Sequence, residues 1–169
     1  MAPSGIHLRR ATRRDVAFVM ASERLPEASP FVSHWDEERH LSGIHGSAMA
    51  YLIGGRDRRE PEGFAILGDL DERNGNVCLY RIVSVQPGTG FGAPFLAAVV
   101  DWAFRETAVH RLWLDVVTDN DRARHVYERA GFVFEGVLRQ AYIATTGRRA
   151  DLAIMSMLRP EWEARGGST

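Results

Sequence analysis

The hydrophobic positions along this chain change their period from segment to segment, and the period predicts the secondary structure. Short runs that alternate or are continuously apolar predict strands over 6–10, 48–53, 63–67, 77–85, 111–117, 133–138, 142–144 and 150–158. Apolar residues spaced three or four apart predict helices over 12–24, 33–42, 93–106 and 121–130. The chain therefore runs β, α, α, an antiparallel series of strands, one βαβ unit, and then a helix followed by a terminal hairpin.

Residues at the predicted helix ends support this assignment. Thr12 is a suitable N-cap, and Ser33 with Asp36 three residues later resembles a capping box. Pro94 lies in the first turn of its helix, where the N–H that proline lacks would have no intrahelical partner. Gly131 follows the last of these helices as a C-cap.

Strands and helices are partly segregated along the chain, which predicts an α+β (mixed α/β) fold. We expect a single domain over residues 1–169, with a core over about 6–160 and a frayed tail over 163–169. The central sheet should be mixed but mostly antiparallel, with roughly six to seven strands flanked by about four helices. The single βαβ crossover should be right-handed.

Composition narrows the class of protein. A chain of 169 residues with a net charge of −1 has no bulk attraction for nucleic acid or for a membrane. The N-terminus lacks the apolar run of a signal peptide, and the single cysteine, Cys78, excludes an internal disulfide, so we expect a cytoplasmic protein. The six histidines form no metal-ligand pattern, and we expect no metal. All other basic residues are arginines, which is typical of a GC-rich, bacterial-like genome.

A glycine-rich turn separates the strand over 77–85 from the next helix. Gly88, Gly90 and Gly92 lie where that helix begins, and the unpaired N–H groups of a helix start form an anion site. A P-loop is excluded, because it requires a lysine and the chain has none. The turn also satisfies the dinucleotide pattern G-x-G-x-x-A, with Asp115 and Asp119 placed as ribose-binding acids. A dinucleotide-binding protein remains a remote alternative, because that fold needs repeated β/α alternation.

A second motif lies one helix and one strand downstream of the glycine turn. It reads NDRARHVYERAGF, from Asn120 to Phe132. Together, this motif and the turn PGTGFG resemble the GNAT superfamily of N-acetyltransferases, at the spacing typical of that family. The phrases RLWLDV, NDRARHVYERAGF and EGVLR are most similar to the branch that includes ribosomal-protein N-terminal acetyltransferases.

The resemblance implies acetyl-coenzyme A as co-substrate and implies the residues that bind it. Backbone groups would bind the pyrophosphate and the pantetheine arm, from Gly88, Thr89, Gly90, Phe91 and Gly92 for the former and from Val83 and Val85 for the latter. Asn120 resembles a residue that contacts pantetheine, and it is also a suitable helix N-cap.

Tyr127 resembles the family's catalytic tyrosine, which acts as general acid or as hydrogen-bond donor to the leaving sulfur. It also lies on the apolar stripe of its helix, where a core aromatic would lie. A phenol has a pKa of about 10 and a thiol about 8.5, so full proton transfer from an unperturbed Tyr127 is uphill by roughly 2 kcal/mol.

The sequence departs from the family at two positions. Pro87 stands where many relatives carry Arg or Gln, and Cys78 stands where many carry a Glu that serves as base. Gln86, one residue before Pro87, is the candidate to replace the missing side-chain contact with the pyrophosphate. The general base is not identified. Glu135, Asp69 and Glu27 are the carboxylates considered for that role.

The implied reaction is direct attack of a primary amine on the thioester, and the acceptor is open. A protein N-terminus, a polyamine, an aminoglycoside and another small amine all fit. We expect residues 25–35 and 142–149 to shape the acceptor side, with Phe31 and Trp35 as wall candidates. Several acidic residues in this region favour a cationic amine: Glu23, Glu27, Asp36, Glu37 and Glu38. A non-catalytic acyl-CoA-binding module is the alternative function, and a homodimer would be common among relatives.

Overall fold

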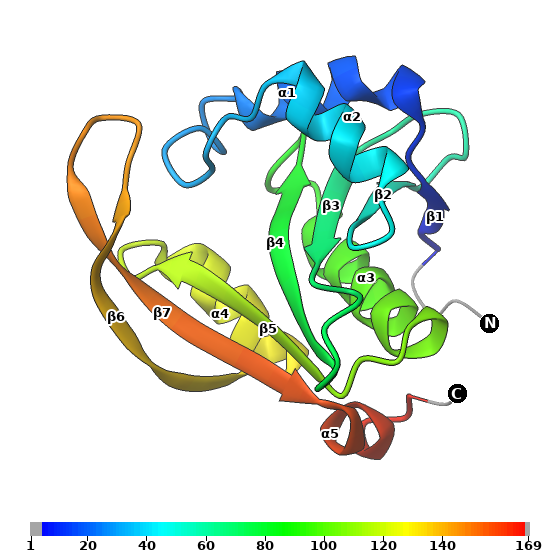
Figure 1. Cartoon of the computed structure of the whole chain (residues 1–169), viewed down its shortest axis with the longest axis vertical. Helices are drawn as coiled ribbons and strands as arrows, with labels where there is room; N and C mark the ends of the chain where they lie inside the picture. The colour runs from blue at the N-terminus through cyan, green and yellow to red at the C-terminus, as the bar shows by residue number, and fades with distance from the viewer. Residues whose placement is uncertain (1–4, 168–169) are drawn as a thin grey trace.

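A seven-stranded sheet forms the centre of the structure, a computed structural model that describes residues 5–167 (Figure 1). Its strands are β1 (His7–Arg10), β2 (Ala50–Gly55), β3 (Gly63–Gly68), β4 (Asn76–Ser84), β5 (Arg111–Val117), β6 (Val133–Ile143) and β7 (Arg149–Leu158). Their order in the sheet is β1-β2-β3-β4-β5-β7-β6. All neighbouring pairs are antiparallel except β4 and β5, which are parallel.

Helices cover both faces of this sheet. They are the 3-10 turn η1 (Arg13–Asp15) and the α-helices α1 (Val16–Glu23), α2 (Glu37–His45), α3 (Gly92–Glu106), α4 (Asp121–Ala130) and α5 (Arg159–Ala164). Phe95, Leu96 and Val99 of α3 pack in the larger core against residues of β2 to β5. A second core, around Val19 of α1 and Phe64 of β3, fills the opposite face beneath α1 and α2. The α1 and α2 layer lies over β2, β3 and β4, so the β5–β7–β6 half of that face has no helix on it (Figure 1).

The parallel pairing of β4 and β5 is short. It joins Asn76–Cys78 to Arg111–Trp113 and then ends, although both strands continue. On its other side β4 has a β-bulge, because Arg81 pairs with Ile66 and Leu79 with Leu67, which leaves Tyr80 as the extra residue. A bulge bends and twists its strand. β4 therefore turns away from β5, and beyond Cys78 its edge opposite β3 pairs with no other strand of residues 5–167.

The fold class and the sheet agree with the sequence prediction, and the first two helices differ in detail. The predicted helix over 12–24 begins as the 3-10 turn η1 before α1. The predicted N-cap Ser33 was wrong, and α2 begins after Asp36, whose carboxylate accepts a hydrogen bond from the Arg39 N–H at 2.8 Å. Asp36 thus has the role that was given to Ser33, which shifts the helix along the chain by three to four residues.

Two further corrections concern the C-terminal part. The strands predicted over 133–138 and 142–144 form one long strand, β6, whose pairing with β7 shifts register at two bulges. The predicted frayed tail overlaps the helix α5, which was not predicted and which extends to Ala164. Trp162 anchors this helix, because its indole N–H donates to Asp101 at 2.7 Å and its ring stacks on Phe104. Residues 168–169 of the predicted tail lie outside the described residues.

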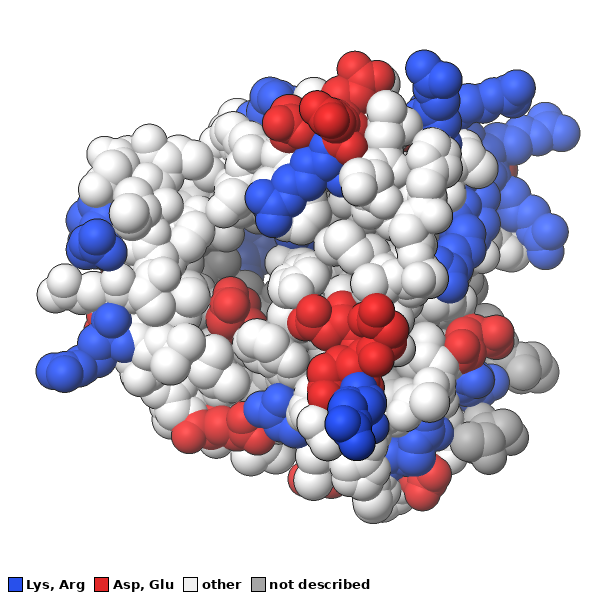
Figure 2. Space-filling view, in the orientation of Figure 1, with Lys and Arg blue, Asp and Glu red and all other residues white. Residues whose placement is uncertain are grey.

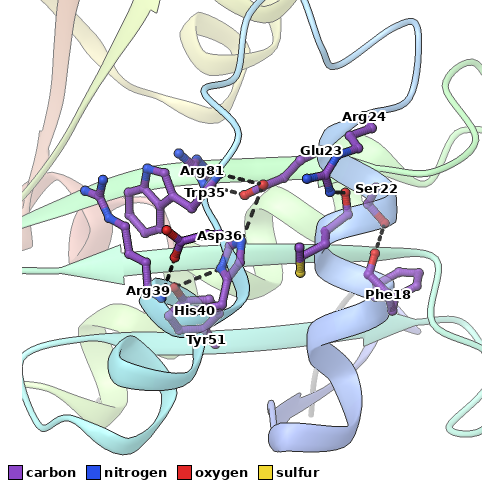
Figure 3. A network of polar contacts seen from close by, with 11 residues as sticks. Phe18, Ser22, Glu23, Arg24, Trp35, Asp36, Arg39, His40, Tyr51 and Arg81 are labelled. Carbon is purple, nitrogen blue, oxygen red and sulfur yellow. Dashed lines mark hydrogen bonds and ion pairs between the residues drawn. The ribbon is translucent and has the colours of Figure 1, made fainter.

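A charged network is buried between α1, α2 and β4 (Figure 3). Glu23, at the end of α1, is fully buried and accepts hydrogen bonds from Arg81 of β4 and from the Trp35 N–H. His40 of α2, also fully buried, lies 3.4 Å from Glu23 and 3.2 Å from the Tyr51 hydroxyl. Glu23 thus joins both ends of the α1–α2 segment (residues 24–36) to β4.

We expect Glu23→Ala to lower the free energy of unfolding by about 3–5 kcal/mol, because it leaves the Arg81 charge buried without a counterion. Glu27→Ala is the matched control, since Glu27 is an exposed glutamate of the same segment, and it should change stability by less than about 0.5 kcal/mol. Urea denaturation measures both. A Glu23→Ala loss no larger than that of the control would contradict this role.

Candidate active site

The glycine turn between β4 and α3 has a backbone that only glycine adopts without strain. Gly88 and Gly90 have φ values of +87° and +78°, in the left-handed region. A Cβ atom at Gly88, Gly90 or Gly92 would meet nothing within 4 Å, so all three face open space. The turn therefore presents bare backbone on an accessible side, as a close approach by a ligand requires.

The N–H groups of this turn are available. Those of Gly90, Phe91 and Gly92 donate to no acceptor within the described part of the chain, and no side chain caps the start of α3. Because a helix start carries partial positive charge, these groups form an anion site.

An arginine from another turn reaches this anion site. Arg56, in the turn between β2 and β3, donates from Nη2 to the Thr89 carbonyl at 3.0 Å and to its hydroxyl at 3.2 Å. Glu62 holds Arg56 in place, accepting from its backbone N–H at 2.7 Å and pairing with its guanidinium at 3.4 Å. This contact of Arg56 leaves no local signal in the sequence, because 33 residues separate it from Thr89.

The open edge of β4 carries free backbone groups, and the register identifies their residues. The Val85 N–H donates to Glu62 at 2.9 Å, on the β3 side. The backbone N–H and C=O groups of successive residues point to opposite sides of a strand, so those of Val83, like the Val85 N–H, point toward β3. Ile82 and Ser84 therefore direct their N–H and C=O groups into the opening beside β5, and a coenzyme contact of Val83 or Val85 stays a prediction. The buried Ser84 hydroxyl has no partner within residues 5–167.

Tyr127, the predicted catalytic residue, lies partly buried on α4, with its ring edge-on to Phe132 at 5.9 Å. Burial raises the pKa of Tyr127 to about 12, and the negative charge of Asp115 adds to the increase. Full proton transfer from such a phenol to a thiolate would be uphill by about 5 kcal/mol. Tyr127 is therefore suited to donate a hydrogen bond to a developing thiolate and unsuited to lose its proton.

Asp115 of β5 is the carboxylate whose charge raises the pKa of Tyr127. The sequence had suggested Asp115 only as a ribose-binding acid. Its side chain is exposed, yet the surrounding protein removes enough water to raise its pKa above the ordinary value. Its charge also contributes to the raised pKa of Cys78, whose main cause is burial. Cys78 is thus a buried neutral thiol and not a nucleophile.

Two of the three carboxylates that the sequence suggested as bases, Asp69 and Glu135, have other partners. Both Asp69 oxygens accept from the Tyr80 hydroxyl, at 3.2 and 3.1 Å. Glu135 pairs with Arg111 and accepts from Ser156 at 2.7 Å, and the Arg111 bond in particular holds its pKa below the usual value. A lowered pKa makes Glu135 a weaker base, and Glu27, which is exposed, stays a prediction.

Asn120 fills the structural role that its sequence allowed. Its side-chain oxygen accepts from the Ala123 N–H at 3.2 Å and caps α4. A ligand contact of Asn120 through its amide nitrogen stays a prediction.

The uncovered half of the sheet forms a hollow between the β6–β7 hairpin and the α1–α2 segment, visible in Figure 2. Two contacts of the hairpin turn border it: the Thr145 hydroxyl donates to the Ser29 carbonyl at 3.5 Å, and Arg148 pairs with Asp119 at 2.6 Å. The hydroxyl of Tyr142, a residue of β6 in the same hairpin, is buried without a partner among the described residues. Both predicted acceptor-side segments thus meet at one hollow.

Within residues 5–167, no group of three or more His, Cys, Asp or Glu side chains could hold a metal ion. A search of the helices in the same range finds none with the length and apolarity needed to cross a membrane.

A comparison with models of protein families shows the family to which this chain belongs. The model of the acetyltransferase (GNAT) domain matches residues 6–133, which is more than half of the chain. The chain therefore belongs to the GNAT acetyltransferase family, as its motifs predicted.

Curated relatives agree. The spermidine N(1)-acetyltransferase of Vibrio cholerae is 25% identical over 170 residues, covering 94% of this chain and 96% of the relative. The putative ribosomal N-acetyltransferase YdaF of Bacillus subtilis is 30% identical over 102 residues, covering 60% of this chain and 55% of the relative. This chain is an acetyl-CoA-dependent N-acetyltransferase of the same family.

The fold is also similar to a crystal structure of the Vibrio cholerae spermidine N-acetyltransferase in complex with CoA and spermine. The TM-score is 0.83 at 23% identity, and the match covers 95% of this chain and 99% of the other.

The left-handed backbone predicts a contrast between two neighbouring glycines. Gly90→Ala should destabilise the protein by about 1–2 kcal/mol, because alanine is strained at a positive φ. Gly92→Ala should be neutral or stabilising by up to about 1 kcal/mol, because Gly92 is the first residue of α3 and has room for a methyl group. Urea denaturation measures the free energy of unfolding of both variants. Equal changes would contradict the left-handed backbone conformation of Gly90.

Proposed function

We propose that this enzyme transfers the acetyl group of acetyl-CoA to a primary amine by direct attack on the thioester, in the opening between β4 and β5. One observation carries the proposal: an unpaired strand edge leads directly into a glycine turn with free N–H groups. Such an edge accepts an extended amide-containing chain as an added strand, and the turn accepts its phosphates.

The pantetheine arm is proposed to bind the backbone groups of Ile82 and Ser84, with the Ser84 hydroxyl as a further partner. The pyrophosphate is proposed to bind the N–H groups from Gly88 to Gly92. The co-substrate supplies the activated thioester, and the protein positions it. Family membership and the unpartnered Ser84 hydroxyl support this assignment.

Arg56 is proposed to compensate for Pro87, which stands where many relatives have Arg or Gln. In a trans peptide the C=O of one residue and the N–H of the next point in opposite directions. By binding the Thr89 carbonyl, Arg56 fixes that peptide plane, so that the Gly90 N–H points away from Arg56. The same guanidinium adds positive charge beside the phosphates.

The chemistry is assigned to Asp115 and Tyr127. Asp115 takes the proton of the acceptor amine, directly or through water, and its raised pKa makes it a stronger base. Tyr127 donates a hydrogen bond to the sulfur as the thioester breaks. The Ile82 N–H, which faces the opening, is the proposed donor to the carbonyl oxygen that becomes negative.

The class of acceptor is proposed from the similarity to two relatives. The similarity to a spermidine acetyltransferase supports a polyamine or another small amine, and the similarity to YdaF supports a protein N-terminus. A cytoplasmic location fits the reduced Cys78 and the need for acetyl-CoA, and the homodimer stays a prediction.

The function is tested by incubating the protein with acetyl-CoA and a panel of amines while free thiol is measured. The proposal expects amine-dependent thiol release. Tight binding of acetyl-CoA with no thiol release from any amine would favour a non-catalytic acyl-CoA-binding module instead.

Arg56→Gln should raise the Kd for CoA about tenfold, since it removes a positive charge and releases the Thr89 peptide, and ordering the backbone of one residue on binding costs about 1–2 kcal/mol. Arg58→Gln is the control, because Arg58 is an exposed arginine of the same turn, and it should leave the Kd within about twofold. Calorimetric titration with CoA measures both. If the two variants bind CoA equally well, Arg56 does not position the glycine turn.

Asp115→Asn should lower kcat about 100-fold or more while the Kd for CoA is unchanged, because it removes the base without altering the coenzyme site. A base works only when deprotonated, so wild-type kcat/KM should fall as the pH falls through the raised pKa of Asp115, and the variant should lose this limb. Glu135→Gln is the carboxylate control. Full activity of Asp115→Asn would exclude Asp115 as the base.

A further inference from the structure

Trp35, at the end of the α1–α2 segment, packs between two arginines (Figure 3). The guanidinium carbon of Arg39, from α2, lies 3.7 Å from the centroid of the indole ring, and that of Arg81, from β4, lies 3.8 Å away. Two guanidinium groups cannot both occupy one position over the same face, so they flank the ring. We call these three residues the arginine–tryptophan cluster.

This cluster carries a net positive charge. Glu23 neutralises Arg81, whereas Arg39 forms no ion pair within the described part of the chain. The nearby Asp36 carboxylate is used as the N-cap of α2. Capping leaves the Asp36 carboxylate charged, and Glu27, Glu37 and Glu38 are exposed in the neighbourhood, so the cluster is a pair of cations within a surface that also carries acidic groups.

Arg81 has hydrogen-bonding capacity left over. It is 7% exposed, and only its Nη1 donates, to Glu23; its other N–H groups meet no acceptor among residues 5–167. Burial is the main influence on its pKa and lowers it. A buried cation with open donors is stabilised by an added anion, and a guanidinium binds a carboxylate through two parallel hydrogen bonds.

The cluster borders the acceptor side of the opening. The Trp35 ring is edge-on to Tyr80 at 6.4 Å, and Tyr80 is the bulged residue at which β4 turns away from β5. Side chains of Arg are visible inside and above the hollow beside the β6–β7 hairpin (Figure 2).

We propose that the acceptor carries an anionic group, a carboxylate, which binds Arg39 and Arg81 beside Trp35 while its amine lies near Asp115. This rests on the proposed acetyl transfer and names its substrate class. The opposite charges at the two ends orient the acceptor in one direction. A polyamine, which is cationic along its whole length, offers no acceptor to the open N–H groups of Arg81.

The geometry also bounds the length of the acceptor. Arg81 lies three residues beyond Cys78, and Cys78 pairs with Trp113, two residues before Asp115. Because the two strands are parallel, these offsets differ by one residue, or about 3.3 Å along the strands. Paired strands lie about 4.8 Å apart and these two have separated here, so the backbone positions of Arg81 and Asp115 are on the order of 6–10 Å apart across the opening. The amine and the carboxylate are then separated by several bonds, as in an ω-amino acid or a short peptide.

The test compares matched acceptors in the thiol-release assay: 4-aminobutyrate with butylamine, 6-aminohexanoate with hexylamine, and spermidine alone. In at least one pair, the carboxylate should raise kcat/KM about tenfold or more, and spermidine should be poorer than that acceptor. Arg39→Gln should reduce this ratio to near one. Arg14→Gln, an exposed arginine on η1, should leave the ratio unchanged.

Each other outcome is decisive. A ratio of one or less in both pairs, or spermidine as the best acceptor, overturns the anionic acceptor and leaves acetyl transfer intact. If no amine releases thiol, the proposed function fails, and calorimetric titration of the CoA complex with 6-aminohexanoate and hexylamine then tests the cluster. Equal or undetectable binding of the two overturns it.

Discussion

Two parallel strands that pair over three residues and then separate determine the rest of this structure. Parallel strands normally continue their ladder, because unpaired backbone groups between two strands are costly. Here the Tyr80 bulge turns β4 away after Cys78, so one edge of β4 is left open. Everything assigned to the site borders that opening: Ile82 and Ser84 on its edge, the glycine turn at its end, Tyr127 and Asp115 on the side of β5 and α4.

The two sides of the opening carry opposite charges. Arg56 and the start of α3 provide positive charge at the glycine turn, where phosphates are expected. Asp115 is the carboxylate that is proposed to take a proton from the acceptor amine. The buried Glu23–Arg81 pair connects the two sides, because it joins the α1–α2 segment, which borders the hollow, to β4, the strand that is proposed to bind the coenzyme.

Much of this could be predicted from the sequence, because the signals are local. The glycine turn, the apolar stripe with Tyr127 and the order of strands each arise from residues a few positions apart. Arg56, Asp115 and the direction of the Ile82 backbone groups could not be found in this way. The role of Arg56 depends on a contact between two turns that are distant in the sequence. The raised pKa of Asp115 depends on the residues that surround it in the fold, and the direction of the Ile82 backbone groups depends on the register of β4 with β3. None of these leaves a periodic pattern in the sequence.

Amide hydrogen exchange, measured by NMR with and without CoA, tests the central claim most directly. In the free protein, the Val83 and Val85 amides should exchange slowly because they bond to the β3 side, whereas those of Ile82, Ser84 and Gly90 should exchange fast. Saturating CoA should protect the latter three. If CoA binds and these three amides continue to exchange as in the free protein, the coenzyme lies elsewhere and the account is wrong.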